Sequence, residues 1–287
     1  MYPAQFEYVA PDSLDEAIKL LADSGGEAKI LAGGHSLLPA MKLRLAQPGT
    51  LIDLRKVPGL NEIKADGDGV TIGAMVTHAE VARSDEVKRA LPALAEAANV
   101  VGDLQVRNRG TLGGSLAHAD PAGDPPAAFL ALDGSIVAKG PNGERTIAAN
   151  DFFIDILTTA LAEDEIVTAV KFPTLAAGTG TAYVKFDHPA SHYALTGVAA
   201  AVKLDGSGNV ESVKVGVTGV GPKAYRATAV EEALVGKGAD AIADAASHAA
   251  DGIDCNDDIH ASAEYRAHLA TVFTRRALQA AFSRANG

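Results

Sequence analysis

Cysteine is almost absent from this chain, because Cys255 is the only one among 287 residues. A single thiol cannot form an internal disulfide, and it cannot hold an iron–sulfur cluster, which takes about four thiolates. Cys255 also lies in the acidic run DGIDCNDD, where carboxylates raise rather than lower the pKa of a thiol. The sequence therefore excludes two classes of function for the chain alone and predicts an unreactive cysteine.

Basic blocks and long apolar runs are missing as well. The chain has 25 Lys and Arg residues against 36 Asp and Glu, a net charge of -11, and no cluster of basic residues, so nucleic acid is not an expected partner. No apolar stretch reaches the ~18 residues of a membrane span, and the N-terminal MYPAQFEYVA lacks the features of a signal peptide. We expect a cytoplasmic protein, with a peripheral position at the inner face of the membrane, through a larger complex, as the alternative.

Several motifs of known chemistry are absent. No G-x-x-x-x-G-K-[ST] sequence occurs, which excludes a P-loop nucleotidase, and no G-x-G-x-x-G opens a helix after a strand, which argues against a Rossmann site. The chain also has no nucleophile elbow and no metal triad. The sequence accordingly predicts no catalytic side chain and no metal ligand set.

The elements that are present indicate an α+β protein of three lobes. Residues 1–60 combine a helix, which Ser13 and Glu16 cap, with two strands, AKILAGG and TLIDLR, and read as a small α/β unit. Residues 61–175 carry a hairpin around Gly67–Gly69, a helix capped by Thr77 and Glu80, and a second hairpin with Asn142–Gly143 at its tip.

The third lobe, residues 180–287, follows the linker AAGTGT. Three strands, TAYVKFDH, YALTGVAAAVKL and NVESVKVGVTGV, predict an antiparallel sheet. Thr228 with Glu231 reads as a further capping box, and the tail SAEYRAHLATVFTRRALQAAF has apolar residues at helical spacing.

Two glycine turns carry the functional signal. In KILAGGHSLLPAMK a strand ends on Gly33–Gly34 before a helix-like segment, and RNRGTLGGSLAHADPAGD repeats the pattern at Gly113–Gly114. Glycine turns of this kind leave backbone N–H groups pointing the same way with no Cβ to hold off a ligand, so they bind anions. A single Gly-Gly is more often a plain strand end. Two turns, each beside a hydroxyl residue, suit a diphosphate that is held from both sides.

These residues resemble a known family. LAGGHSLLPAMKLRLAQPGTLIDLR and VRNRGTLGGSLAHADPAGD together resemble the FAD-binding medium subunit of the molybdenum hydroxylases, the xanthine dehydrogenase and carbon monoxide dehydrogenase group. The resemblance covers nearly the whole chain and is strongest to the separate medium subunit of bacterial carbon monoxide dehydrogenase-like enzymes. It implies the FAD-binding fold of the PCMH/vanillyl-alcohol-oxidase type, with FAD between the first two lobes, and a C-terminal antiparallel sheet with a helical bundle.

The resemblance also implies a set of cofactor-binding residues. The first turn would wrap the diphosphate, ribitol and ribose of FAD, and the second would close the diphosphate from the other side. Asp124 would accept a hydrogen bond from the cofactor, Val101 would pack on it, Val167 and Lys185 would lie at the flavin, and Tyr193 would cover one flavin face. The residues implied for the two turns are Ile30, Leu31, Ala32, Gly33, Gly34, His35, Ser36 and Leu37 in the first, and Thr111, Gly113, Gly114, Ser115 and Ala117 in the second.

Plainer roles stand beside the functional ones for the other polar residues. His35 fits a turn cap as well as a cofactor contact, and Arg107 and Arg109 fit a bracing or subunit-facing role as well as phosphate neutralisation. A loop-shaping role is favoured over acid–base catalysis for His118 and Asp120. A structural role is favoured over a metal pair for His188 and His192, which flank Pro189.

The function implied by the resemblance is electron transfer. A large subunit with a molybdenum cofactor would oxidise the substrate, and a small subunit with two [2Fe–2S] clusters would pass the electrons to this FAD. The flavin would then reduce a quinone, NAD or oxygen, in a dimer of heterotrimers, and the substrate of the complex would be carbon monoxide, an aldehyde or an N-heterocycle. The alternatives are a free-standing flavoenzyme on the same fold and a non-catalytic nucleotide-binding module.

Overall fold

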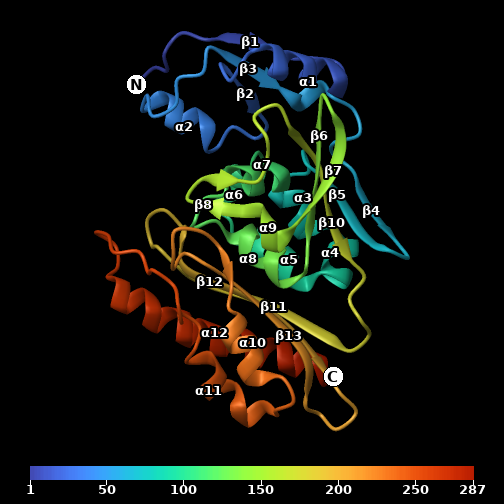
Figure 1. Ribbon diagram of the computed structural model, residues 1–287, viewed down its shortest axis with the longest axis vertical. Coiled ribbons are helices and arrows are strands. Elements are labelled where there is room, and N and C mark those ends of the chain that lie inside the picture. The colour runs from blue at the N-terminus through green and yellow to red at the C-terminus, as the bar shows by residue number, and fades with distance from the viewer.

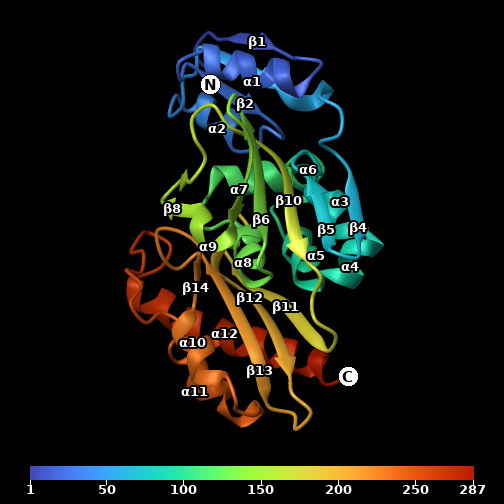
Figure 2. The ribbon, with the colours of Figure 1, turned by 45° about the vertical axis from the view of Figure 1, so that its right-hand side comes forward.

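The computed structural model describes all 287 residues and arranges them as a column of three larger sheets, with helices and one separate two-stranded pair beside them (Figure 1). The N-terminal lobe lies at one end of the column and the C-terminal sheet with its helices at the other (Figures 1 and 2). None of the helices combines the length and the apolar character of a membrane span.

The first lobe is a three-stranded parallel sheet of order β1-β3-β2. Helix α1 buries Ala17, Ile18 and Leu21 at helical spacing against this sheet, which gives the lobe its small core. Ser13 caps the helix through the Glu16 N–H, but the Glu16 carboxylate accepts from the Asp12 N–H rather than from Ser13, so only half of the predicted box forms. The elements are β1 (Glu7–Val9), α1 (Leu14–Asp23), β2 (Ala28–Leu31), α2 (Leu37–Lys42), β3 (Thr50–Asp53) and the 3-10 turn η1 (Leu54–Lys56).

The middle lobe is a five-stranded antiparallel sheet of order β4-β5-β10-β6-β7, with helices α3 to α8 beside it. Both predicted hairpins are confirmed, as is the capping box of Thr77 and Glu80. Its strands are β4 (Ile63–Asp66), β5 (Gly69–Gly73), β6 (Ser135–Gly140), β7 (Gly143–Ala148), the short pair β8 (Phe153–Asp155) and β9 (Thr158–Thr159), and β10 (Ile166–Pro173). Its helices are α3 (His78–Arg83), α4 (Asp85–Ala90), α5 (Pro92–Asn99), α6 (Leu104–Arg107), α7 (Leu112–His118), α8 (Asp124–Ala131) and α9 (Ala149–Phe152).

The third sheet is antiparallel, as predicted, and lies between two layers of helices (Figure 2). Helix α12 packs on one face, and α5 and α8 of the middle lobe pack on the other. Strand β12 is consequently buried on both faces, which explains its almost continuous apolar run. The elements are β11 (Thr179–Asp187), β12 (Ala194–Leu204), β13 (Val210–Thr218), β14 (Tyr225–Arg226), α10 (Thr228–Leu234), the 3-10 turn η2 (Ala239–Ala241), α11 (Ile242–Ala246) and α12 (Ala263–Ala285).

Two sequence predictions in this region are wrong. The capping box of Thr228 and Glu231 does not form, because Arg226 and the Val215 N–H take the Glu231 carboxylate and the N-cap position falls on Ala227. The linker AAGTGT is shorter than expected, since β11 begins inside it at Thr179. The unreactive Cys255 stays a prediction; burial first, and then Asp254, raises the pKa of its thiol.

Candidate functional site

The two glycine turns lie against each other between the first and middle lobes. A Cβ on Gly33 would stand 2.2 Å from the Arg109 carbonyl oxygen and 2.7 Å from the Gly110 Cα. A Cβ on Gly114 would lie 3.5 Å from the Cβ of Ala32. The approach of backbone to backbone at Gly33 leaves no room for a side chain, so glycine is required where the two segments meet.

The first turn offers unpaired backbone donors. It links β2 to α2, and the N–H groups from Ala32 through Leu37 donate no hydrogen bond within the chain. Gly34 has a φ of +77°, which bends the chain here, and the Ser36 hydroxyl makes no cap bond to α2. Orphaned N–H groups at a half-buried turn are the donors that a phosphate group requires.

The second turn is built differently, because its N–H groups are used inside the protein. The Thr111 hydroxyl caps α7 by accepting from the Gly114 N–H at 3.1 Å, and the Thr111 carbonyl accepts from Ser115 at 3.0 Å. The Gly113 N–H donates to the Ala74 carbonyl at 3.1 Å. The expectation of free N–H groups at Gly113, Gly114 and Ser115 is therefore wrong.

These N–H groups have partners because the start of α7 packs against the residues that follow β5. A Cβ on Gly113 would lie 2.6 Å from the Ala74 Cβ, so this glycine serves the packing of the helix on the strand. The Leu112 N–H donates to the Val76 carbonyl at 2.9 Å, which fixes the helix further. The second turn is a rigid wall against which the first turn rests, and Ala117 lies half-buried one turn further along α7.

A buried acidic group lies at the start of α8. The carboxylate of Asp124 is 5% exposed and accepts from the Lys185 ammonium at 3.0 Å and from the Tyr183 hydroxyl at 2.5 Å. Lys185 also donates to the Val100 carbonyl at 2.9 Å. Burial raises the pKa of Asp124 to about 6, against the opposing effects of Lys185 and Tyr183. The predicted residues Asp124 and Lys185 thus pair with each other.

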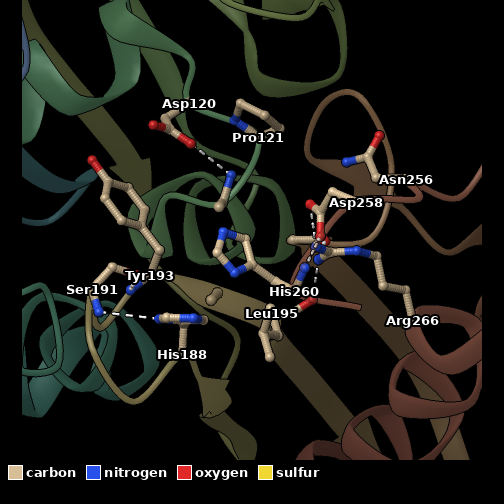
Figure 3. A pocket seen from close by; sticks show the side chains of 13 residues that line it. Asp120, Pro121, His188, Ser191, Tyr193, Leu195, Asn256, Asp258, His260 and Arg266 are labelled. Atoms are coloured by element: carbon tan, nitrogen blue, oxygen red, sulfur yellow. Dashed lines mark hydrogen bonds and ion pairs between the residues drawn. The ribbon is translucent and has the colours of Figure 1, made fainter. Parts of the chain in front are cut away.

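The loop before β12 brings Tyr193 to the first turn. Tyr193 is 45% exposed, and burial together with the Asp120 carboxylate raises the pKa of its hydroxyl, whereas the Ser36 hydroxyl that faces it has the opposite effect. Behind Tyr193 lies a cavity of about 380 Å³. Asp120 and Tyr193 stand on one side of it, and Asp258 and Arg266 on the other (Figure 3).

The remaining predicted contacts are spread around this centre. Ile30 and Leu31 end β2, His35 is exposed at the tip of the first turn, and Leu37 opens α2. Val101 is half-buried behind α5, whereas Val167 is 6% exposed in the core of the middle sheet. The contacts of these residues with a cofactor stay predictions.

Two of the other polar candidates make hydrogen bonds within their own loops. Arg107 Nη1 donates to the carbonyls of Val101 and Gly102 at 3.1 and 3.2 Å, which is the bracing role. The Asp120 carboxylate accepts from the Ala122 N–H at 2.9 Å.

The two histidines of the Tyr193 loop likewise have partners within it. His188 Nδ1 accepts from the N–H groups of Ala190 and Ser191, and His192 Nδ1 lies 3.2 Å from the Asp187 carboxylate.

Two buried residues of this region escaped the sequence analysis. Tyr183 reads as one more apolar position in a strand, and only the fold shows its bond to Asp124. His78 is 3% exposed at the start of α3, its Nδ1 has no partner, and its ring lies behind Gly110. Burial, with a smaller effect from Arg107, lowers the pKa of His78 to about 4. No local pattern signals either role, because the partners come from distant segments.

A turn of free donors that rests on a glycine-rich helix, beside a buried carboxylate, fits an extended dinucleotide such as FAD, and the fold is that of an FAD-binding flavoprotein. Residues 4–175 match the family model of the FAD-binding domain in molybdopterin dehydrogenase, and residues 181–281 match that of the CO dehydrogenase flavoprotein C-terminal domain. The chain belongs to the FAD-binding medium subunits of the molybdenum hydroxylase family, and it is an FAD-dependent oxidoreductase subunit.

Individual relatives agree over the full length. The chain is 41% identical to the carbon monoxide dehydrogenase medium chain of Hydrogenophaga pseudoflava, covering 99% of both chains. It is 42% identical to the nicotine 6-hydroxylase medium subunit of Paenarthrobacter nicotinovorans, covering 96% of this chain and 97% of that one. Its fold superimposes with a TM-score of 0.96 on a chain of the H. pseudoflava carbon monoxide dehydrogenase that lacks the Mo-pyranopterin moiety, at 44% identity and 99% coverage of both.

Proposed function

We propose that this chain accepts electrons from the [2Fe–2S] clusters of a small subunit and passes them through FAD to an external acceptor, a quinone, NAD or oxygen. A large subunit with a molybdenum cofactor would oxidise the substrate in the same complex. The run of unpaired N–H donors from Ala32 through Leu37 carries the proposal, because nothing inside the chain uses them. The FAD supplies the redox chemistry, and the protein binds and orients it.

Different residues of the chain would contact different parts of FAD. The first turn would donate to the diphosphate, and α7 would hold that turn in place from Thr111 onwards. Asp124 would accept a hydrogen bond from the cofactor, while Tyr193 would cover one face of the flavin ring and limit its access to water. The other proposed contacts are Ile30, Leu31, Val101, Ala117, Val167 and Lys185.

The names of the relatives indicate which partner subunits to expect. They are called medium chains or subunits, which supports an assembly with a large and a small subunit, and we propose a dimer of such heterotrimers in the cytoplasm. Two relatives of nearly equal identity carry the names of different substrates, carbon monoxide and nicotine. Substrate choice therefore belongs to the large subunit, and the medium chain alone oxidises no substrate.

Co-purification of the native complex tests this function. Three subunit bands with a flavin absorption spectrum, iron and molybdenum are the expected result. A single yellow band without metals would replace the proposal with a free-standing flavoenzyme on the same fold. A colourless protein without reducible flavin would point to a nucleotide-binding module instead.

A further inference from the structure

One face of β11 forms a polar seam with the middle lobe. Alternate residues of this strand point the same way, and each of three such residues bonds to a helix of the other lobe. The Thr181 hydroxyl accepts from the Ala93 N–H at 3.2 Å, Tyr183 reaches Asp124, and Lys185 bridges Asp124 and the Val100 carbonyl. The seam therefore fixes the third sheet to α5 and α8 beside the flavin site.

The Tyr183 side chain packs over a glycine of the neighbouring strand. Its side chain is 7% exposed, and a Cβ on Gly197 of the neighbouring strand would lie 2.2 Å from its hydroxyl oxygen. Its N–H donates to the Glu96 carboxylate at 2.8 Å, which fixes the strand locally. The hydroxyl thus lies over Gly197, where a larger residue would displace it, and from there it donates to Asp124.

We propose that Tyr183 is a positioning residue of the flavin site. Its hydroxyl and the Lys185 ammonium each take one oxygen of the Asp124 carboxylate, so that Asp124 meets the cofactor in one orientation and as the charged form. This inference rests on the proposed function, because it assigns Asp124 to the cofactor. It adds a residue that touches Asp124 rather than FAD.

The charges around Asp124 determine what the loss of Tyr183 does. Lys185 and the Tyr183 hydroxyl favour the carboxylate, the Lys185 charge more strongly, whereas burial and the Asp187 carboxylate disfavour it. Tyr193 is the remaining ionisable group that senses the charge of Asp124. Removal of the Tyr183 hydroxyl therefore moves the titration of Asp124 to higher pH, and removal of the Lys185 charge moves it further.

The experiment uses the native complex and compares Tyr183→Phe with Tyr225→Phe. Tyr225 is a matched control, because its hydroxyl is also largely buried and donates to the Ala249 carbonyl at 2.9 Å, away from Asp124. The midpoint potential of the flavin is measured against pH from about 5 to about 8, across the titration of a buried carboxyl. The bend assigned to Asp124 is the one that Asp124→Asn abolishes, whereas a bend caused by protonation of the flavin itself stays in that variant.

Tyr183→Phe should raise the pH of the bend by about one unit, a tenfold change in proton affinity, since a hydrogen bond to a charged group is lost. Lys185→Gln should raise it further, and Tyr225→Phe should leave it in place. The inference is overturned if Tyr183→Phe behaves like Tyr225→Phe, if Lys185→Gln has no effect, or if Asp124→Asn abolishes no bend of the wild-type curve. A wild-type complex without flavin would instead overturn the proposed function itself.

Discussion

The two glycine turns have similar sequences and opposite hydrogen bonding. Around Gly33–Gly34 the backbone donors are unused, whereas around Gly113–Gly114 every N–H from Leu112 through Ser115 has an acceptor in the chain. The second turn is therefore held in place by the chain itself, whereas the first has backbone donors left over for a ligand. A binding site built this way combines a fixed wall with an open set of donors, so changes in the wall should cost stability and changes in the donors should cost affinity.

Gly33→Ala should have the largest effect, because it forces the two turns apart. The new Cβ would overlap the Arg109 carbonyl, a backbone atom that cannot move aside as a flexible side chain can. We expect a loss of about 4 kcal/mol in the free energy of unfolding together with loss of bound FAD. Gly67→Ala is the control, since nothing lies within 4 Å of its Cβ position. Urea unfolding and flavin content measure both effects, and equal stability of the two variants would contradict the close contact.

The second-largest effect should be a loss of folding stability in acid, caused by protonation of His78. The pKa of His78 is about 4 in the folded chain and near 6.5 in the unfolded chain, so the unfolded chain binds more protons between these values. Stability should accordingly fall as the pH drops from about 6.5 to about 4, by up to about 3 kcal/mol. Asp124, whose pKa is raised to about 6, acts in the opposite direction, because stability from this group falls as the pH rises toward 6.

The His78→Leu variant separates the two groups. The difference in unfolding free energy between variant and wild type cancels the contribution of Asp124, and it should change with pH only through His78. Denaturant titrations at about pH 7, 5.5 and 4 measure this difference, because they run from above the pKa of His78 in the unfolded chain to its pKa in the folded chain. A difference that does not vary with pH would show that His78 is not the group responsible.

Thr111→Ala should have a smaller effect of the same kind. It removes the oxygen that accepts from the Gly114 N–H at the start of α7, and the loss of such a cap costs about 1 kcal/mol. FAD affinity should fall only to the extent that the weakened cap lets the second turn move, because Thr111→Ala leaves the donors of the first turn unchanged. Thr111→Ser keeps the oxygen and should restore the melting temperature. If serine is as damaging as alanine, the cap is not what holds the turn.

The sequence was sufficient where structure depends on neighbours along the chain. The hairpin at Asn142–Gly143 and the capping box of Thr77 and Glu80 involve residues a few positions apart, and both form. Thr228 and Glu231 have the same spacing, but the Glu231 carboxylate pairs with the Arg226 guanidinium instead of capping the helix. The ion pair therefore replaces the local capping interaction.

The site shows where sequence reasoning ends. Gly-Gly beside a hydroxyl residue predicted both turns. In the second turn, Gly114 and Ser115 donate to Thr111 close by in the chain, but Leu112 and Gly113 donate to the carbonyls of Val76 and Ala74, and no motif connects these to α7. Tyr183 and Asp124 are 59 positions apart and become partners only because the third sheet packs on α5 and α8. The chemistry of a segment could be read from its residues, whereas the choice of partner depended on how distant segments pack.

Ser36→Ala should have the smallest effect on stability and a clear one on binding. Ser36 makes no cap bond to α2, so its loss should change the free energy of unfolding by less than about 0.5 kcal/mol. If the first turn donates to a charged diphosphate, the missing hydroxyl should weaken FAD binding about tenfold, which corresponds to one hydrogen bond to a charged group. Isothermal titration of the flavin-free complex with FAD measures the affinity. The opposite pattern, with stability lost and affinity kept, would mean that the first turn is a structural wall like the second.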